Sequence, residues 1–155
     1  MGEITVYSGS PEQTQALGRR IGALMPAGAV IAAHGGLGMG KTLLAAAIAA
    51  GMGIADNILS PTFVFFNEYR GRLPFCHIDA YRLEDAEAEE LEQIGLDECF
   101  MHGQAVFVEW PQFIAAYLPP RHIDLYIERG DKERRRSLRF VYDAEDGWIE
   151  EALCG

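Results

Sequence analysis

The sequence predicts an α/β protein, with a layered domain whose mostly parallel central sheet carries additional antiparallel strands. Three observations predict this class. Short apolar segments alternate with helical patterns in the first fifty residues, a glycine-rich loop joins an apolar segment to a helix, and paired β-type segments follow later. The chain has 155 residues and no linker-like segment, so we expect residues 1–155 to form a single domain.

The first third of the chain predicts two strands and two helices. Residues 3–7 alternate between apolar and polar side chains, which is typical of a half-buried strand. Ser10 and Pro11 then provide an N-cap and a first helical residue. Residues 29–34 are apolar without interruption, which is typical of a strand buried on both faces, and a helix is predicted from residue 41 to about residue 50.

The remaining chain predicts β-structure around one acidic helix. Residues 62–70 and 75–81 are aromatic and β-branched segments that we expect to pair as a hairpin. Residues 84–98 hold eight acids and no base, and they predict a helix that either is simply solvated or docks a basic partner. We expect the later elements to be a strand at 105–111, a short helix at 113–118, strands at 123–130 and 137–143, and a helical tail at 147–155.

The charge distribution limits how the chain could contact nucleic acid. The net charge is −10, which repels phosphate over most of the surface, so an RNA role needs a local basic patch or a partner that holds the RNA. Residues 129–139 hold six of the thirteen Lys and Arg residues. That stretch is either a charged turn between strands or a segment that contacts a nucleotide or RNA.

The composition predicts a cytoplasmic protein. No apolar run approaches the roughly 18 residues of a membrane span, and the first residues lack the pattern of a signal peptide. Cys76, Cys99 and Cys154 are widely spaced and form no CxxC pair, which favours ordinary thiols in a reducing compartment.

The segment HGGLGMGKT at residues 34–42 is the strongest motif. Gly35, Gly40, Lys41 and Thr42 match the phosphate-binding pattern GxxxxGK[ST], with a predicted strand before it and a helix after it. Glycines in such a loop let backbone N–H groups face phosphate oxygens, and the helix N-terminus adds further donors. Lys41 would then reach the β- and γ-phosphates, and the Thr42 hydroxyl would ligate Mg²⁺.

A nucleotide-hydrolysing site also needs an acid at the end of a neighbouring strand. Asp79 and Glu109 each follow an apolar segment, so each is a candidate, and each could equally be a solvated acid at a strand end. Ser60-Pro61-Thr62 either supplies a hydroxyl that senses the γ-phosphate or is a cap and turn. Trp110 either stacks on a base or a partner or packs in the core.

Four motifs occur in order along the chain: GGLGMGKT at 35–42, SPTF at 60–63, HIDAYRL at 77–83 and EWP at 109–111. With these motifs and the acidic EELEQIGLDE segment, the chain resembles the TsaE family of small bacterial P-loop ATPases over nearly its whole length. The resemblance implies a P-loop NTPase-like fold with ATP and Mg²⁺ as cofactors.

The resemblance also implies a function. TsaE proteins are required to make N6-threonylcarbamoyladenosine at position 37 of tRNAs that read ANN codons. They act with TsaD and TsaB after a TsaC-type enzyme makes threonylcarbamoyl-AMP, and their ATP hydrolysis resets the TsaD–TsaB complex without transferring the threonylcarbamoyl group. For this chain it implies slow, Mg²⁺-dependent ATP hydrolysis that TsaD-like and TsaB-like partners stimulate, with tRNA reached through that complex and no membrane involved.

Carried over by position, the resemblance assigns Mg²⁺ to Thr42 and Glu109 and makes Asp79 the Walker B-like acid. It adds Thr62, in a switch-like loop, to the catalytic set that includes Lys41. It implies that the nucleotide contacts the loop and one aromatic residue: Gly36, Leu37, Gly38, Met39, Gly40, Lys41, Thr42, Leu43 and Trp110.

Two other functions stay open at this point. A small-molecule or nucleoside P-loop kinase would need an acceptor pocket and an arginine-bearing lid, and the basic stretch 129–139 could serve as that lid. The second open function is a binding module that depends on nucleotide and hydrolyses it negligibly. The resemblance also makes the segments near Pro11 and Arg134 candidates for nucleotide contact.

Overall fold

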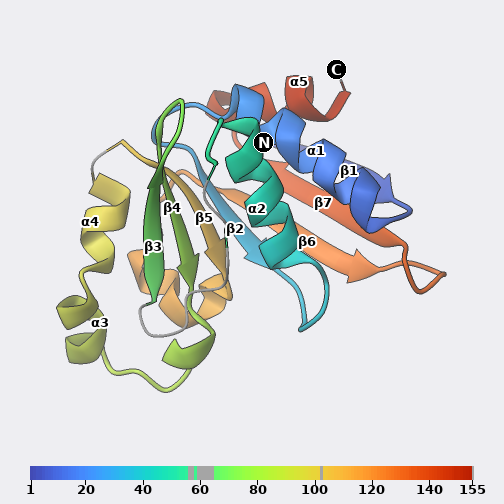
Figure 1. Ribbon diagram of the computed structural model, residues 1–155. Helices are drawn as coiled ribbons and strands as arrows, with labels where there is room; N and C mark the ends of the chain where they lie inside the picture. The colour runs from blue at the N-terminus through green and yellow to red at the C-terminus, as the bar shows by residue number, and fades with distance from the viewer. Residues whose placement is uncertain (56–57, 59–64, 102, 155) are drawn as a thin grey trace.

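A single seven-stranded sheet organises the computed structural model, which describes residues 1–55, 58, 65–101 and 103–154 (Figure 1). The strand order is β1-β7-β6-β2-β5-β4-β3. The strands are β1 (Gly2–Ser8), β2 (Val30–His34), β3 (Phe66–Arg70), β4 (Pro74–Asp79), β5 (Ala105–Glu109), β6 (Ile123–Arg129) and β7 (Arg136–Tyr142).

The centre of the sheet is parallel and its two sides are antiparallel. β2 runs parallel to both β5 and β6, and β5 runs parallel to β4. β7 joins antiparallel to β6 and β1, and β3 pairs antiparallel with β4. The predicted fold class, a mostly parallel centre with antiparallel additions, is therefore confirmed.

Alternate side chains of the central strands pack into two hydrophobic cores, one on each face of the sheet. In β5, Phe107 points into the core beneath the long helices, whereas Val106 and Val108 point into the core on the opposite face. In β2, Ile31 and Val30 divide in the same way. Because both faces of these strands are covered, their residues are apolar without alternation up to the last position, which is His34 in β2 and Glu109 in β5.

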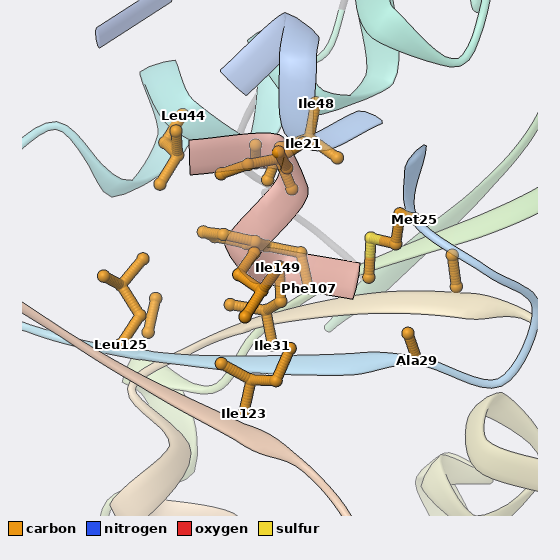
Figure 2. Packing of buried hydrophobic residues seen from close by; sticks show 14 of the residues in the cluster. Ile21, Met25, Ala29, Ile31, Leu44, Ile48, Phe107, Ile123, Leu125 and Ile149 are labelled. Carbon is orange, nitrogen blue, oxygen red and sulfur yellow. The ribbon is translucent and has the colours of Figure 1, made fainter. Parts of the chain in front are cut away.

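The first core lies between the sheet and the helices α1 (Pro11–Leu24), α2 (Lys41–Gly51) and α5 (Trp148–Cys154) (Figure 1). Ser10 caps α1 as predicted, because its hydroxyl accepts a hydrogen bond from the N–H of Gln13 at 3.2 Å. Figure 2 shows Ile21 and Ile48 from the two long helices meeting Phe107 and Ile31 from the sheet. This packing fixes α2, and with it the residues at its N-terminus.

The second core lies on the other face and corrects one prediction. The acidic segment 84–98 is not one helix: α3 (Ala88–Ile94) ends at Gly95, and α4 (Leu96–Met101) starts directly after it. Gly95 has φ of 83°, a left-handed conformation that closes a helix and that glycine adopts without strain. Leu91 and Leu96 nevertheless pack into this core, so the segment has one buried side and one acidic, exposed side.

Other boundaries differ in detail. The predicted strand 62–70 is described only as β3 from Phe66, because residues 59–64 lie outside the described part of the chain. The predicted helix 113–118 is a 3-10 helix, η2 (Pro111–Tyr117), and further 3-10 turns are η1 (Tyr81–Leu83) and η3 (Ala144–Asp146). In the ranges that the structure describes, no helix combines the length and apolar character needed to cross a bilayer.

Candidate functional site

The loop between β2 and α2 presents backbone donors at a helix end. Gly38 and Gly40 have φ of 77° and 95°, values that glycine adopts at little cost and other residues rarely adopt. Gly40 is the N-cap of α2 and has no side chain with which to cap it. The N–H groups of the first turn of α2 are therefore arranged as an anion-binding site, and the helix dipole adds partial positive charge there.

Two acids reach this helix end from the sheet. Asp79 ends β4 and Glu109 ends β5, and the two residues are direct partners in the parallel register. Both follow the alternation that points Phe107 toward α2, so both side chains lie on the α2 side of the sheet. The two candidate acids of the sequence thus belong to one site.

Glu109 is linked by hydrogen bonds to residues from two elements. The Thr42 hydroxyl donates to its carboxylate, at 2.9 Å from Oε2 and 3.1 Å from Oε1. Nε2 of His77, on β4, lies 2.6 Å from the same Oε2. Glu109 is only 3% exposed and His77 is fully buried, so polar side chains orient this carboxylate.

Lys41 is nearly buried as well, with 5% of the residue exposed. Its Nζ donates to the carbonyl oxygen of Gly35 at 2.5 Å and lies 3.6 Å from the centroid of the Trp110 ring. Burial lowers the pKa of Lys41, and the nearby carboxylates of Glu109 and Asp79 oppose that shift. An ammonium group in this setting favours an anionic ligand.

The surroundings of Asp79 disfavour its ionised form. Burial raises the pKa of Asp79, and the charge of Glu109 raises it further. The backbone N–H of Tyr81, which donates to Oδ1 at 3.0 Å, is the main contact that opposes this rise. Asp79 is therefore an acid whose carboxylate is poorly compensated and available for a proton or a water molecule.

Trp110 adopts a left-handed backbone conformation, with φ of 58°, directly after the β5 strand. This conformation is uncommon for a bulky residue and places the indole between two other aromatic rings. Tyr81 is 5.0 Å away and Phe113 is 6.0 Å away, centroid to centroid, and Phe113 is stacked on the indole. The Trp110 ring packs against other aromatic side chains of the protein, as one of its two interpretations expects. Its contact with Lys41 also places the ring in the site.

Two neighbouring pockets meet at the glycine loop. The first has a volume of about 390 Å³ and is lined by the loop, by both acids and by two aromatic residues: Leu37, Gly38, Met39, Gly40, Lys41, Thr42, Leu43, Asp79, Tyr81, Glu109 and Trp110. The second has a volume of about 400 Å³ and lies between the same loop, the start of α1 and the β6–β7 turn. Its walls include Pro11, Thr14, Arg134 and Arg136.

The basic stretch 129–139 forms this β6–β7 turn together with the adjoining strand ends. Arg136 connects the turn to the loop, because its Nη2 donates to the carbonyl oxygen of Gly38 at 3.4 Å. The predicted charged turn is therefore present, and part of it faces the site. The segments near Pro11 and Arg134, far apart in sequence, line the same pocket.

The oxygen donors at this site suit a hard cation that is also coordinated by phosphate oxygens and water. The Thr42 hydroxyl and Glu109 carboxylate are oxygen donors, which Mg²⁺ prefers. Among the described residues, no three His, Cys, Asp or Glu side chains gather into a metal site of their own. A Mg²⁺ ion here would complete its coordination with phosphate oxygens and water, as it does in nucleotide sites.

Most predicted site residues share the first pocket. Gly36 does not line it, and Thr62 lies outside the described residues. His77 and Tyr81 were not singled out in the sequence, although HIDAYRL contains both. His77 lies two residues before Asp79, so strand alternation alone places the two side chains on the same face.

Comparison with known proteins gives a consistent result. The model of the family described as "Threonylcarbamoyl adenosine biosynthesis protein TsaE" matches residues 8–138. The tRNA threonylcarbamoyladenosine biosynthesis protein TsaE of Bacillus subtilis (strain 168) is 43% identical over 145 residues, which are 92% of this chain and 89% of that protein. Its namesake in Mycobacterium tuberculosis (strain H37Rv) is 40% identical over 126 residues, or 76% and 74% of the two chains.

A solved structure is also similar. The crystal structure of Bacillus subtilis YdiB matches this chain with a TM-score of 0.82 and 28% sequence identity. The match covers 97% of this chain and 94% of the other.

Proposed function

Because this chain belongs to the TsaE family of threonylcarbamoyladenosine biosynthesis proteins, we propose that it binds and slowly hydrolyses ATP with Mg²⁺ during the N6-threonylcarbamoyladenosine modification of tRNA. The observation that carries the proposal is the meeting of Lys41, Thr42 and Glu109 at the N-terminus of α2. These residues come from two distant parts of the sequence, and together they provide one cation and two metal-type oxygen ligands.

The glycine loop and α2 would bind the phosphates. Backbone N–H groups from Gly38 to Leu43 donate to phosphate oxygens, and the two left-handed glycines allow the close approach. Lys41 exchanges its Gly35 carbonyl partner for the β- and γ-phosphates. Because the ammonium is already desolvated, this exchange adds attraction without a further large loss of water.

Thr42 and Glu109 would hold Mg²⁺ between them. An ion held there would supply positive charge beside the β- and γ-phosphates. Asp79 would accept a hydrogen bond from the attacking water and aim it at the γ-phosphate. Thr62, which the structure does not describe, remains a predicted contributor from the switch-like segment.

The second pocket would take the nucleoside part of ATP. It opens on the same glycine loop, and its arginines carry a charge opposite to that of the phosphates. Pro11 offers an apolar wall suited to a flat base. The Ser10 hydroxyl accepts from the N–H of Gln13 and still has a hydrogen to donate to a polar group of the nucleoside. The sequence expectation for the segments near Pro11 and Arg134 is consistent with this proposed assignment, because both segments line this pocket.

We further propose TsaD-like and TsaB-like proteins as partners, in the cytoplasm, with tRNA reached through them. The mouth of the first pocket supports a partner: Leu37 is 69% exposed and Tyr81 is 47% exposed, and both are large side chains with apolar surface. A partner that covered these residues would also exclude water from the phosphates. The overall charge of −10 favours indirect over direct RNA binding.

The test combines the purified chain with ATP, Mg²⁺, the TsaD-like and TsaB-like proteins of the same organism, and unmodified tRNA. We expect slow phosphate release by the chain alone, faster release with both partners, and a complex whose formation depends on nucleotide. Modified nucleoside in the tRNA is measured by mass spectrometry. Lys41→Ala should abolish release and modification, whereas Lys132→Ala, which removes an exposed lysine in the turn, should leave both unchanged.

Three outcomes would contradict the proposal. Phosphate transfer from ATP to a small acceptor would identify the kinase alternative. Nucleotide-dependent assembly without any phosphate release would identify a binding module. Normal tRNA modification by Lys41→Ala would remove the nucleotide site from the function altogether.

A further inference from the structure

His77 is a fully buried polar residue to which the proposed chemistry assigns no task. Its Nε2 contacts Oε2 of Glu109 at 2.6 Å. Its Nδ1 is buried and has no hydrogen-bond partner among the described residues. Burying a polar atom without a partner costs free energy, so an apolar residue would be expected here unless the Nε2 contact serves a purpose.

The contact defines the hydrogen-bond direction. A carboxylate has only acceptor atoms, so Nε2 carries the hydrogen and donates it to Glu109. In a neutral ring with its hydrogen on Nε2, the unpaired Nδ1 is the acceptor nitrogen. Phe107, the direct neighbour of His77 on β5, contacts the ring edge-to-face at a centroid distance of 6.1 Å and limits its rotation.

The two carboxylate oxygens of Glu109 have different sets of hydrogen-bond partners. Thr42 and His77 both contact Oε2, at 2.9 Å and 2.6 Å, while Oε1 lies 3.1 Å from the Thr42 hydroxyl. A carboxylate whose one oxygen is held by a rigid imidazole cannot rotate freely about its side-chain bonds. Its other oxygen therefore stays directed toward the start of α2, where the nucleotide phosphates are proposed to lie.

We propose that His77 is a positioning residue: by donating from Nε2 to Glu109, it fixes the carboxylate that binds Mg²⁺ and so sets how strongly Mg²⁺ supports nucleotide binding. The inference rests on the proposed function, because it concerns the ion held beside the bound nucleotide. Removing a side chain that hydrogen-bonds to a metal ligand without touching the metal typically weakens metal binding by about 10- to 100-fold.

The experiment measures affinity for a nonhydrolysable ATP analogue by calorimetry, first in EDTA and then in Mg²⁺. We expect His77→Met to keep the affinity in EDTA within about twofold, since the glycine loop and Lys41 are unchanged, and to lose about tenfold of the Mg²⁺ enhancement. His77→Gln should largely restore the enhancement, because its side-chain amide provides a donor near the position of Nε2. His122→Met is the matched control: His122 is half-buried and also contacts a carboxylate, Asp124 at 3.3 Å, but lines neither pocket.

The wild-type protein provides a second measurement that does not depend on the folding of a variant. A long-range ¹H–¹⁵N NMR spectrum of the His77 ring should show hydrogen on Nε2, and this signal should shift when Mg²⁺ joins the bound analogue. An Nε2 without hydrogen, an unshifted signal, or an undiminished Mg²⁺ enhancement in His77→Met would overturn the inference. An equal loss in His77→Gln and His77→Met would overturn it too, because it would indicate packing in place of hydrogen bonding.

These results are distinct from a failure of the proposed function. If the wild type bound no analogue in either condition, the proposed nucleotide site itself would be wrong. If the wild type bound the analogue with Mg²⁺ enhancement and His77→Met did the same, only the positioning role would be wrong.

Discussion

The ammonium group of Lys41 lies 3.6 Å from the centroid of the Trp110 ring, in a cation–π contact within the first pocket. The same group donates to the Gly35 carbonyl at 2.5 Å, so within the described part of the chain its two direct contacts are with neutral groups. Its pKa is lowered by burial, which means that the charged form is short of compensation. A phosphate would supply that compensation and draw the ammonium away from the indole.

The first prediction uses this contact as a reporter. Binding of Mg²⁺ with a nonhydrolysable ATP analogue should change the fluorescence of Trp110, because the charge above its ring moves. Lys41→Ala should weaken binding by about 10- to 100-fold, the usual effect of removing a charged hydrogen-bond donor. The chain has two tryptophans, so Trp148→Phe, on α5, should keep the signal and Trp110→Phe should lose it. A signal that survives in Trp110→Phe would contradict the movement of Lys41.

A second prediction concerns Asp79 and separates stability from activity. The folded-state pKa of Asp79 is raised by burial and by Glu109, so the fold favours its protonated form. That stabilising contribution is present below the ordinary pKa of about 4 and is lost as pH rises through the folded-state pKa. At pH 7 the ionised carboxylate therefore opposes folding, and Asp79→Asn should raise the Tm.

The same substitution should reduce ATP hydrolysis by about 100-fold, because the amide does not accept a proton from water. Thermal melts from pH 7 down to pH 4.5 should show the Tm advantage of Asp79→Asn becoming smaller. Asp85→Asn removes an exposed carboxylate and controls for net charge. A variant that is both less stable and fully active would contradict the environment described for Asp79.

The parts of the site that the sequence predicts are those that depend on local pattern. In the glycine loop, the glycines that set the backbone conformation and the lysine lie within nine residues of each other. The sequence motif therefore predicts the geometry of the loop directly. The pattern predicts Asp79 and Glu109 as strand-end acids but does not indicate whether either belongs to the site. Their pairing depends on the parallel register of β4 with β5, which joins residues thirty positions apart and has no local signal.

The unpredicted features are mainly contacts between distant elements. Nothing in the local pattern indicates that the β6–β7 turn reaches Gly38, since this requires β6 to lie beside β2. The broken acidic helix is different, because Gly95 is a recognisable helix terminator that the continuous acidic pattern obscured. The left-handed Trp110 likewise follows from packing among aromatic rings, which only the folded chain brings together.

A third prediction tests the second pocket through Arg136. Its Nη2 donates to the Gly38 carbonyl at 3.4 Å, and its side chain lines the pocket assigned to the nucleoside. Arg136→Ala should weaken binding of the ATP analogue by about tenfold, which corresponds to the loss of one hydrogen bond to a charged group. Arg135→Ala is the matched control, because Arg135 is exposed, lies outside this pocket and contacts Asp131 at 3.5 Å.

The affinity is measured at two salt concentrations. Arg136→Ala should make binding less salt-dependent than in the wild type, because a cation near the phosphates has been removed. Equal losses in both arginine variants would indicate a general charge effect. No loss in Arg136→Ala would place the nucleoside elsewhere.

The last prediction concerns how α2 is held in place. Gly22 of α1 faces α2 so closely that an added Cβ would lie 1.9 Å from the carbonyl oxygen of Ile48. Backbone atoms cannot move aside as a side chain can, so Gly22→Ala should cost about 1–3 kcal/mol of stability even though alanine favours helix. Gly9→Ala should change stability by less than about 0.5 kcal/mol, because its new Cβ meets only the flexible side chain of Gln13. Urea unfolding at 25 °C measures both variants, and a Gly22→Ala protein as stable as wild type would show that the two helices do not pack at this distance.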